Sequence, residues 1–456
     1  MKKIVGIVVA LIVVVALGAA GWVYLGRNPM AFAGGSTVAL QDYEASSVTG
    51  VPAQLVKADL VTRGEYLTHA ADCQACHSAP GSAPFTGGFA LTTPFGTIYS
   101  TNITPDKQTG IGNYTDAQFL AVMHRGIRAD GEHLYPAMPY ASYTYMTDGD
   151  VQAIKAYLFT LAPHHAPARK DQLSWPFNHR SLLTLWGVAF NPDTRFRPNT
   201  GESPQWNRGA YLAEAMGHCG ECHTPRNIAF ALDNHSKFTG AVTAGWRAYN
   251  ITSDRDSGIG SWSDQDLYQY LSTGHANGHG GAAGPMGEAS DDSLSYLVPN
   301  DVHALVTYLR SVPAEKSDLP RTVTAPAPAS YKQGVVADFD PRGEKIFAGA
   351  CASCHDWTGV SPVTGYATLT GVRAVNDPNA TNVAQAVING VNRQTDAGKI
   401  FMPAFGQGLS DDDIAAVANY VTARFGAKGA HLTSQDVANL RKQAPQQSNS
   451  RETPNG

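Results

Sequence analysis

One short motif occurs three times in the chain and limits its architecture more than any other feature. The motif is C-x-x-C-H, two cysteines separated by two residues with a histidine directly after the second. It uses all six cysteines of the sequence: Cys73 and Cys76 with His77, Cys219 and Cys222 with His223, and Cys351 and Cys354 with His355. The pattern is typical of covalent c-type haem attachment, in which the thiols form thioethers and the histidine becomes an axial ligand of the iron. The sequence therefore predicts three haem c groups.

Two other chemistries use C-x-x-C pairs, namely zinc binding and dithiol redox exchange. Zinc ribbons place two such pairs within about 15–20 residues, whereas more than a hundred residues separate successive motifs here. A redox dithiol does not require a histidine after its second cysteine. The histidine in all three copies therefore favours haem over both alternatives.

The composition fits several small modules built around a cofactor. A chain of 456 residues is too long for one ordinary core and suits about three domains. The 45 glycines and 27 prolines are typical of loop-rich modules, and a porphyrin supplies the apolar centre that a module of about 100 residues lacks. The net charge is −5 without a basic run, so no feature supports binding of nucleic acid.

The N-terminus carries a long apolar segment. Residues 4–26 are uncharged and long enough to cross a bilayer, which takes about 20 helical residues. Lys2 and Lys3 would hold the N-terminus inside and place the rest of the chain on the periplasmic side of the cytoplasmic membrane. The alternative is a signal sequence, because residues 31–33 read Ala-Phe-Ala and resemble a cleavage site. Residues 1–30 are therefore predicted to be a membrane anchor or a signal.

Repeats outside the motifs define three modules. An Arg-Gly pair about ten residues before each first cysteine begins a predicted short helix, and a capped amphipathic helix closes each module. These closing helices are predicted at 147–161, 300–312 and 410–425. The modules are predicted at 61–165, 206–315 and 338–426, with a mobile tail at 427–456. The predicted fold is all-α: three tandem class I-like cytochrome c domains after an N-terminal transmembrane helix.

Each module also offers one methionine as a candidate second axial ligand. Met138, Met286 and Met402 lie between the middle and the closing helix of their modules, on predicted loops. A thioether ligand favours ferrous iron and raises the potential. In the second module, His275 and His279 are alternatives to Met286 because they lie in the Gly-rich loop before it. Arg125, Arg226 and Arg247 are candidates for pairing with haem propionates.

Several segments resemble the three-haem cytochrome c subunits of membrane-bound bacterial dehydrogenases, especially those of acetic acid bacteria and their relatives. The resemblance covers about residues 60–426. Its marks are Gly-Glu-Tyr-Leu before Cys73, Thr-Asn-Ile-Thr-Pro-Asp at 101–106, Leu-Tyr-Pro-Ala-Met-Pro at 134–139, and Met-Pro-Ala-Phe-Gly at 402–406.

The resemblance implies a cytochrome that takes electrons from a separate catalytic subunit and passes them to ubiquinone in the membrane. In that family the partner is a quinoprotein alcohol dehydrogenase, a flavin-dependent sugar or gluconate dehydrogenase, or a molybdopterin aldehyde dehydrogenase with a small iron–sulfur subunit. Residues 351–362 and 284–288 look more like cytochromes of the molybdopterin type.

The sequence shows no dinucleotide fingerprint, molybdopterin domain or propeller repeat, so we expect no substrate-oxidising site in this chain. The alternative functions are a stand-alone multihaem enzyme such as a peroxidase, which needs an open axial position, and a free electron carrier.

Overall fold

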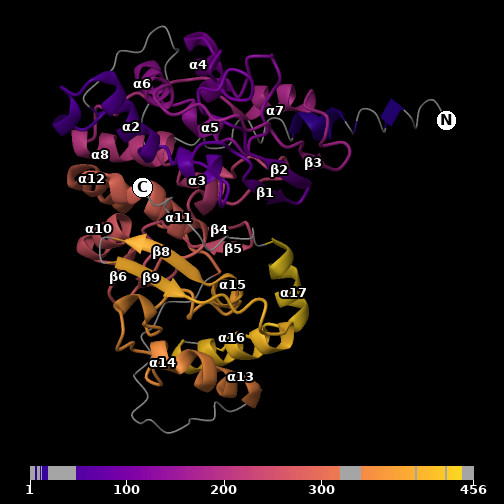
Figure 1. Cartoon of the computed structure of the whole chain (residues 1–456), viewed down its shortest axis with the longest axis vertical. Coiled ribbons are helices and arrows are strands. Elements are labelled where there is room, and N and C mark those ends of the chain that lie inside the picture. Colours follow the sequence, from indigo (N-terminus) through magenta and orange to yellow (C-terminus); the bar gives the residue numbers. More distant parts are fainter. Residues whose placement is uncertain are drawn as a thin grey trace.

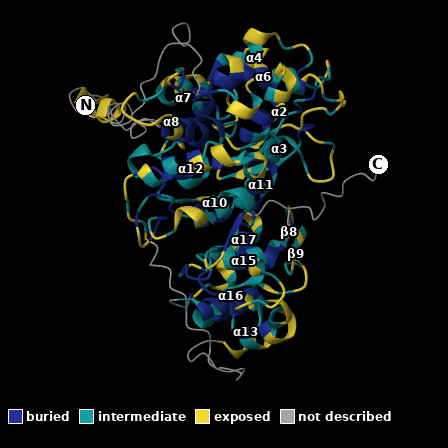
Figure 2. Cartoon of the chain, turned by 90° about the vertical axis from the view of Figure 1, so that its left-hand side faces the viewer, coloured by how far each residue is buried: buried dark blue, intermediate teal, exposed yellow. Residues whose placement is uncertain are grey.

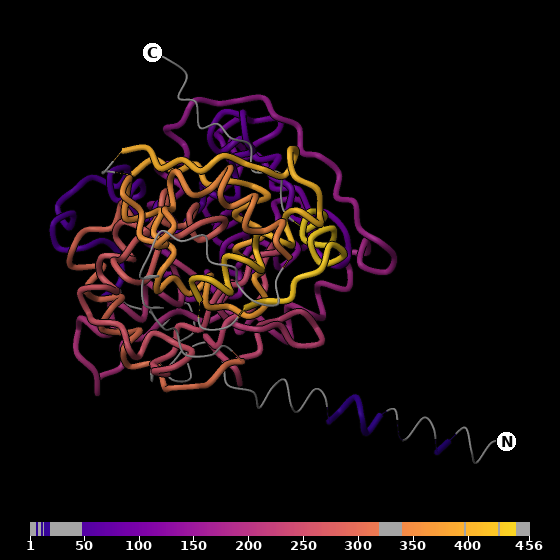
Figure 3. Tube along the Cα trace, turned by 90° about the horizontal axis from the view of Figure 1, so that it is seen from below, coloured from indigo at the N-terminus to yellow at the C-terminus, as the bar shows by residue number. Residues whose placement is uncertain are grey.

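A computed structural model describes residues 6–7, 11, 13–18, 48–318, 340–395, 398–426 and 429–443. The word module denotes a segment that contains one C-x-x-C-H motif: module 1 (residues 48–165), module 2 (204–318) and module 3 (340–443). They stack in chain order along the longest axis, with module 2 in the middle (Figure 1). From the lower end of the stack, the orange and yellow trace of module 3 lies in front of the other two (Figure 3).

The transmembrane helix expected from the sequence has no counterpart in the described residues, where no helix is long and apolar enough to cross a bilayer. Most of the apolar segment 4–26 lies outside the described residues.

Module 1 begins with α2 (Leu60–Ala70) and α3 (Cys73–His77), and it continues through the hairpin β1 (Ala90–Thr93) and β2 (Gly96–Tyr99). The helices α4 (Asp116–Arg125), α5 (Tyr140–Tyr143) and α6 (Asp148–Leu158) complete it. Thr115 caps α4 in a capping box with Gln118, as the sequence predicts for this helix start.

Module 2 repeats this plan. It contains α8 (Pro204–Tyr211), the π-helix η3 (Leu212–Met216), α9 (Gly220–His223), η4 (Asn234–Ser236), β4 (Ala241–Thr243), β5 (Trp246–Ala248), α10 (Asp264–Thr273), β6 (His275–Ala276), β7 (Gly280–Gly281), α11 (Pro285–Asp292), η5 (Leu294–Tyr296) and α12 (Pro299–Ser311). The π-helix of module 2 coincides with one extra residue before the motif. Tyr211 and Cys219 are one residue further apart than the matching Tyr66 and Cys73, and a π-turn accommodates a single inserted residue.

Module 3 contains α13 (Pro341–Ile346), the π-helix η6 (Phe347–Cys351), α14 (Ala352–His355), η7 (Gly365–Ala367), α15 (Thr381–Asn389), β8 (Val391–Thr395), β9 (Gly398–Met402), α16 (Asp411–Phe425) and α17 (Ser434–Gln443). The last helix differs from the mobile tail expected at 427–456. Val437 and Leu440 of α17 are buried in the core of the module, so residues 434–443 belong to it. Residues 444–456 lie outside the described part.

In each module the helix before the motif and the closing helix (α6, α12 or α16) cross at a glycine. A Cβ atom on Gly209 of α8 would lie 1.9 Å from the carbonyl oxygen of Ala304 and 2.8 Å from Cβ of Tyr308, both on α12. Gly64 on α2 and Gly343 on α13 stand in the same relation to α6 and α16. The closing helices thus form where the sequence predicts them, and the Arg-Gly pair that precedes each motif provides the close contact.

Modules 1 and 2 share one hydrophobic core, whereas module 3 has its own. Buried residues are concentrated within the modules, as the dark blue segments show (Figure 2). Across the first boundary the Tyr66 hydroxyl donates to Asp301, which also pairs with the buried Arg208. The boundary between modules 2 and 3 is instead bridged by polar side chains of module 3, among them Arg373, Gln385 and Arg393.

Two expectations about regular structure need correction. The fold is not purely α-helical, because each module contains a short antiparallel hairpin. Several prolines at 163–205 predict a loose segment between modules 1 and 2. The segment instead contains β3 (Gln172–Leu173), which pairs with β2, and the helix α7 (Leu182–Phe190). This linker therefore forms one wall of module 1.

Candidate haem sites

A continuous cavity of ≈ 1490 Å³ extends through the three modules, and apolar side chains form most of its wall. Five of the six motif cysteines line it: Cys73, Cys76, Cys219, Cys222 and Cys351. Cys354 is exposed and is not part of the wall. The cavity reaches all three motifs, so the fold brings together residues that are far apart in the sequence.

The three motif histidines share one hydrogen-bonding arrangement. His77 Nδ1 lies 2.7 Å from the Thr101 carbonyl oxygen, His223 Nδ1 lies 2.6 Å from that of Tyr249, and His355 Nδ1 lies 2.6 Å from that of Ala367. A carbonyl oxygen only accepts, so each Nδ1 carries the proton and Nε2 keeps its lone pair for a metal. Burial lowers the pKa of all three imidazoles, which favours this neutral form.

Five of the six motif cysteines do not have the character of a redox-active thiol. Burial is the main cause that raises the pKa of Cys73 and Cys219 to about 12 and that of Cys222 and Cys351 to about 11. Reactive thiols have the opposite shift, because only the thiolate is the nucleophile. In the described residues no three His, Cys, Asp or Glu side chains converge as a metal site. The thiols beside an apolar cavity suit covalent attachment of a large apolar cofactor.

The three candidate methionines also line the cavity. Met138 lies on the predicted loop, two residues before α5, whereas Met402 differs from that expectation because it ends strand β9. Met286 differs from the expectation of a loop, because it is the second residue of α11. Each module thus contributes a cysteine, a histidine and a methionine to the wall of one cavity, which fits a haem c held between imidazole and thioether.

The two histidine alternatives to Met286 have other contacts. His275 stacks on Tyr366 of module 3, with ring centroids 4.3 Å apart, and it is not part of the cavity wall. His279 lines the cavity but stacks on Trp262, with centroids 3.8 Å apart, and lies 3.5 Å from the Asp266 carboxylate. These contacts favour Met286 as the candidate ligand in module 2.

Of the arginines proposed for haem propionates, Arg226 and Arg247 line the cavity, whereas Arg125 is exposed and does not. Both lining arginines are already paired with carboxylates, Arg226 with Glu221 and Arg247 with Asp318. Three further arginines of the cavity wall were missed, because no sequence pattern marks them: Arg128, Arg180 and Arg373.

The motifs of modules 1 and 2 lie close together. Burial raises the pKa of Cys76, and the nearby Asp72, Glu288 and Cys222 raise it further, which places the second motif within electrostatic range of the first. The Gln74 amide donates to the Asp292 carboxylate at 3.4 Å. The C-x-x-C-H motifs of modules 1 and 2 therefore lie near each other at the boundary between these two modules.

Comparison with known proteins places this geometry in a family. Residues 340–421 match the family described as "Cytochrome C oxidase, cbb3-type, subunit III". The chain is 44% identical to the fructose dehydrogenase cytochrome subunit of Gluconobacter japonicus, with 84% of each chain covered. It is 40% identical to the gluconate 2-dehydrogenase cytochrome c subunit of Pantoea cypripedii, covering 84% of this chain and 90% of the relative.

A third relative is the cytochrome c subunit of the quinone-dependent alcohol dehydrogenase of Gluconacetobacter polyoxogenes, which is 36% identical with 84% of each chain covered. These relatives match the chain over most of its length and share the haem-binding character that the cavity, the thiols and the imidazoles indicate. The chain belongs to the family of cytochrome c subunits of bacterial dehydrogenases, with covalently bound haem c and a role in electron transfer.

Proposed function

We propose that this chain binds three haem c groups and transfers electrons from a periplasmic dehydrogenase to ubiquinone in the cytoplasmic membrane. The observation that carries the proposal is the threefold repetition of one donor set on a continuous apolar cavity. Bound haem supplies one-electron chemistry at these sites. The cysteines would attach it, the imidazoles and methionines would hold the iron, and the apolar wall would exclude water. Met138, Met286 and Met402 are the proposed second ligands.

The catalytic partner is proposed to oxidise a sugar or a sugar acid. The relatives named for fructose and gluconate dehydrogenases are 44% and 40% identical to this chain, whereas the relative named for an alcohol dehydrogenase is 36% identical. The aldehyde-oxidising partner of the molybdopterin type, with its iron–sulfur subunit, is the second candidate, supported by residues 351–362 and 284–288.

Module 2 has a central place in this proposal. It is hydrogen bonded to module 1 through Tyr66 and Asp301, and to module 3 through Arg393 and Asp291. It also lies between the other two modules in the stack (Figure 1). Contact with a partner at one end of the stack and with the membrane at the other would therefore place module 2 on the connecting path.

The proposed membrane contact is an apolar surface formed by the linker between modules 1 and 2 and by the adjoining part of module 2. The apolar rim consists of exposed side chains of α7 and its neighbours: Phe177, Leu182, Leu185, Val188, Ile228 and Phe230. Trp186 anchors α7 by donating to the Ala229 carbonyl at 2.9 Å, and Phe95 contacts both Phe177 and Phe230. Exposed apolar patches of this kind mark contacts with lipid or with partners. Because Leu182 and Phe230 also line the cavity, the rim joins this surface to the candidate haem site.

Replacing Leu185 and Val188 together with glutamine is expected to lower vesicle binding and quinone reduction roughly tenfold or more, since each buried apolar side chain contributes about 1.5–3 kcal/mol. Reduction of a soluble one-electron acceptor should be unchanged, because both side chains point away from the protein core, with exposed fractions of 72% and 68%. Val363→Gln, at a residue of module 3 that is 67% exposed, is the matched control. If the double variant reduced the soluble acceptor as poorly as it reduced quinone, the apolar rim would not be a membrane contact.

The function is tested by purifying the chain from gently solubilised membranes and measuring its intact mass together with every protein and cofactor that accompanies it. We expect a mass increase of three haem groups and a flavin-containing dehydrogenase. Molybdenum together with an iron–sulfur subunit would instead identify a partner of the aldehyde-oxidising type. A quinoprotein would identify a partner of the alcohol-oxidising type. A chain that emerges alone, with a high-spin haem that binds carbon monoxide tightly, would support the haem enzyme instead.

A further inference from the structure

Arg393 of module 3 enters module 2 and is almost fully buried there, with 5% of its side chain exposed. Its Nε atom donates to the Asp291 carboxylate at 3.1 Å, and one terminal nitrogen donates to the carbonyls of Gly274 and Ala282 at 3.2 and 3.3 Å. The other terminal nitrogen donates to Asp291 at 2.7 Å and to the Thr273 carbonyl at 3.2 Å. All five N–H groups of the guanidinium thus have acceptors, and every acceptor belongs to module 2.

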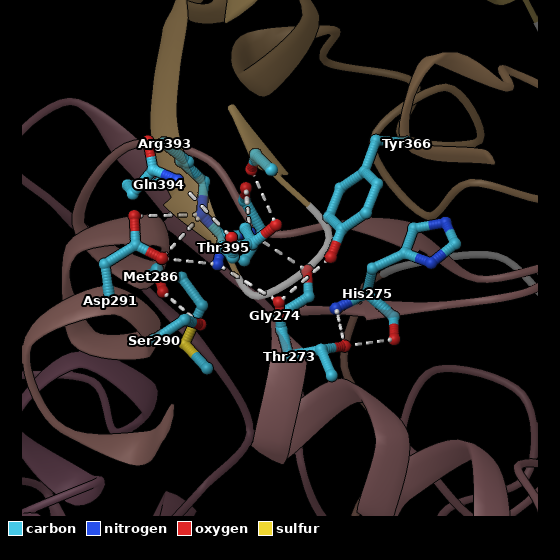
Figure 4. Close-up of polar contacts among 12 residues, drawn as sticks. Thr273, Gly274, His275, Met286, Ser290, Asp291, Tyr366, Arg393, Gln394 and Thr395 are labelled. Atoms are coloured by element: carbon cyan, nitrogen blue, oxygen red, sulfur yellow. Dashed lines mark hydrogen bonds and ion pairs between the residues drawn. The ribbon is translucent and has the colours of Figure 1, made fainter. Parts of the chain in front are cut away.

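These acceptors surround the segment that carries Met286. Ala282 lies four residues before Met286, and Asp291 lies five residues after it on the same helix, α11. Figure 4 shows Arg393 beside Asp291, with Met286 and Ser290 on the neighbouring part of α11. The arginine therefore ties both ends of the Met286 segment to the C-terminal end of α10 at Gly274.

Local shape also accommodates the arginine at this place, because a glycine lies beneath its guanidinium. A Cβ atom on Gly274 would lie 2.4 Å from a terminal nitrogen of Arg393, and the glycine has a φ of +69°. Because glycine has no side chain, the guanidinium can lie directly over Gly274 and donate to the carbonyls of Gly274 and Thr273. No shorter cation would satisfy the same acceptors, because only the arginine fork presents five donors in one plane.

The strand that carries Arg393 is connected to the candidate ligand of module 3. Arg393 lies on β8, which pairs with β9 in the register Val391 with Met402 and Arg393 with Ile400. The same hairpin therefore holds Met402 at the wall of the cavity and fixes the Met286 segment through Arg393. The two candidate ligands are linked through one pair of strands, β8 and β9.

We propose that Arg393 is a positioning residue that holds Met286 in place for the haem iron of module 2, so that module 3 controls the axial ligation of its neighbour. The inference rests on the proposed role of Met286 as a ligand. A thioether binds iron weakly enough that its position must be fixed by the protein around it. Since the segment is clamped from another module, ligation in module 2 depends on the docking of module 3.

The test compares the haem-loaded chain with its Arg393→Gln variant by near-infrared magnetic circular dichroism and a redox titration. Glutamine removes the charge and most of the donors. We expect the Met–iron charge-transfer band to lose about one third of its intensity and one of three reduction potentials to fall. The same potential should fall in Met286→Leu, and the double variant should show no further loss. Arg393→Lys, which keeps the charge, is expected to restore part of the band.

Arg208→Gln is the matched control. Arg208 is 7% exposed, binds Asp301 with two nitrogens and donates to the Gly50 carbonyl of module 1, but it does not touch the Met286 segment. It should lower stability and leave the band complete. If Arg393→Gln does not accumulate, Asp291→Asn weakens the same clamp and takes its place.

An undiminished band with three unchanged potentials in Arg393→Gln would overturn the proposal. Loss of the band from all three haems would also overturn it, because Arg393 would then support the whole chain rather than one ligand. A wild-type protein that lacks the band in module 2 would instead refute the assignment of Met286, and this is seen before any variant is made.

Discussion

Replacing Lys237 with methionine is expected to lower the free energy of unfolding of module 2 by about 3–5 kcal/mol. Lys237 and Glu214 form an ion pair inside the module, where their side chains are 2% and 3% exposed. Burial lowers the pKa of Lys237 and raises the pKa of Glu214, and the attraction between them opposes both shifts. The variant removes this cation and leaves a buried carboxylate, to which the Tyr308 hydroxyl still donates. Guanidinium-induced unfolding of the haem-loaded chain measures the loss.

The double variant Lys237→Met, Glu214→Gln is the matched control. The amide oxygen of glutamine still accepts from Tyr308, and no unpaired charge remains, so most of the lost stability should return. The deficit of the single variant should also depend on pH. A carboxyl pKa raised by folding stabilises the fold below the ordinary value of 4.5, and this contribution is lost as the pH rises through the folded-state pKa. The deficit should therefore shrink from about pH 8 toward 4.5. An equal deficit in both variants would contradict the ion-pair explanation.

The local features of the fold could be predicted from the sequence because they repeat and depend on neighbouring residues. The closing helix α16 begins at Asp411 behind its N-cap Ser410, as its acidic start and apolar spacing predict. The motif histidines His77, His223 and His355 were identified for the same reason, since five consecutive residues define each site. The π-helices could not be predicted from spacing, because module 2 has one extra residue before its motif and module 3 has one fewer, yet both contain a π-helix there.

The contacts between modules could not be predicted, because they join residues that are far apart in the sequence. Arg393 meets Asp291 across 102 residues, and no pattern in either segment indicates the other. The prolines of residues 163–205 predict a loose linker, whereas its pairing with β2 depends on a strand about 75 residues earlier. The position of Met286 between the middle and the closing helix predicts a loop, yet Pro285 before it is a natural first residue of a helix.

The crossing of α8 and α12 in module 2 allows a prediction whose control variant should not lower the stability. Gly209→Ala is expected to destabilise the module by about 2–3 kcal/mol, because the new Cβ would lie 1.9 Å from the Ala304 carbonyl oxygen, a backbone atom that cannot rotate away. The thermal midpoint of this module should fall by on the order of 10 °C. Thermal unfolding followed by circular dichroism in the haem absorption region measures the shift.

Gly187→Ala on α7 makes the same chemical change where a Cβ would meet no atom within 4 Å. Alanine favours helix over glycine by about 1 kcal/mol, so this variant should be neutral or slightly more stable. Both substitutions gain the same helix propensity, and the difference between them isolates the steric cost of separating α8 from α12. Equal midpoints for the two variants would show that the crossing can open without loss. In that case the close contact at Gly209 would not be needed to hold α8 and the following motif against α12.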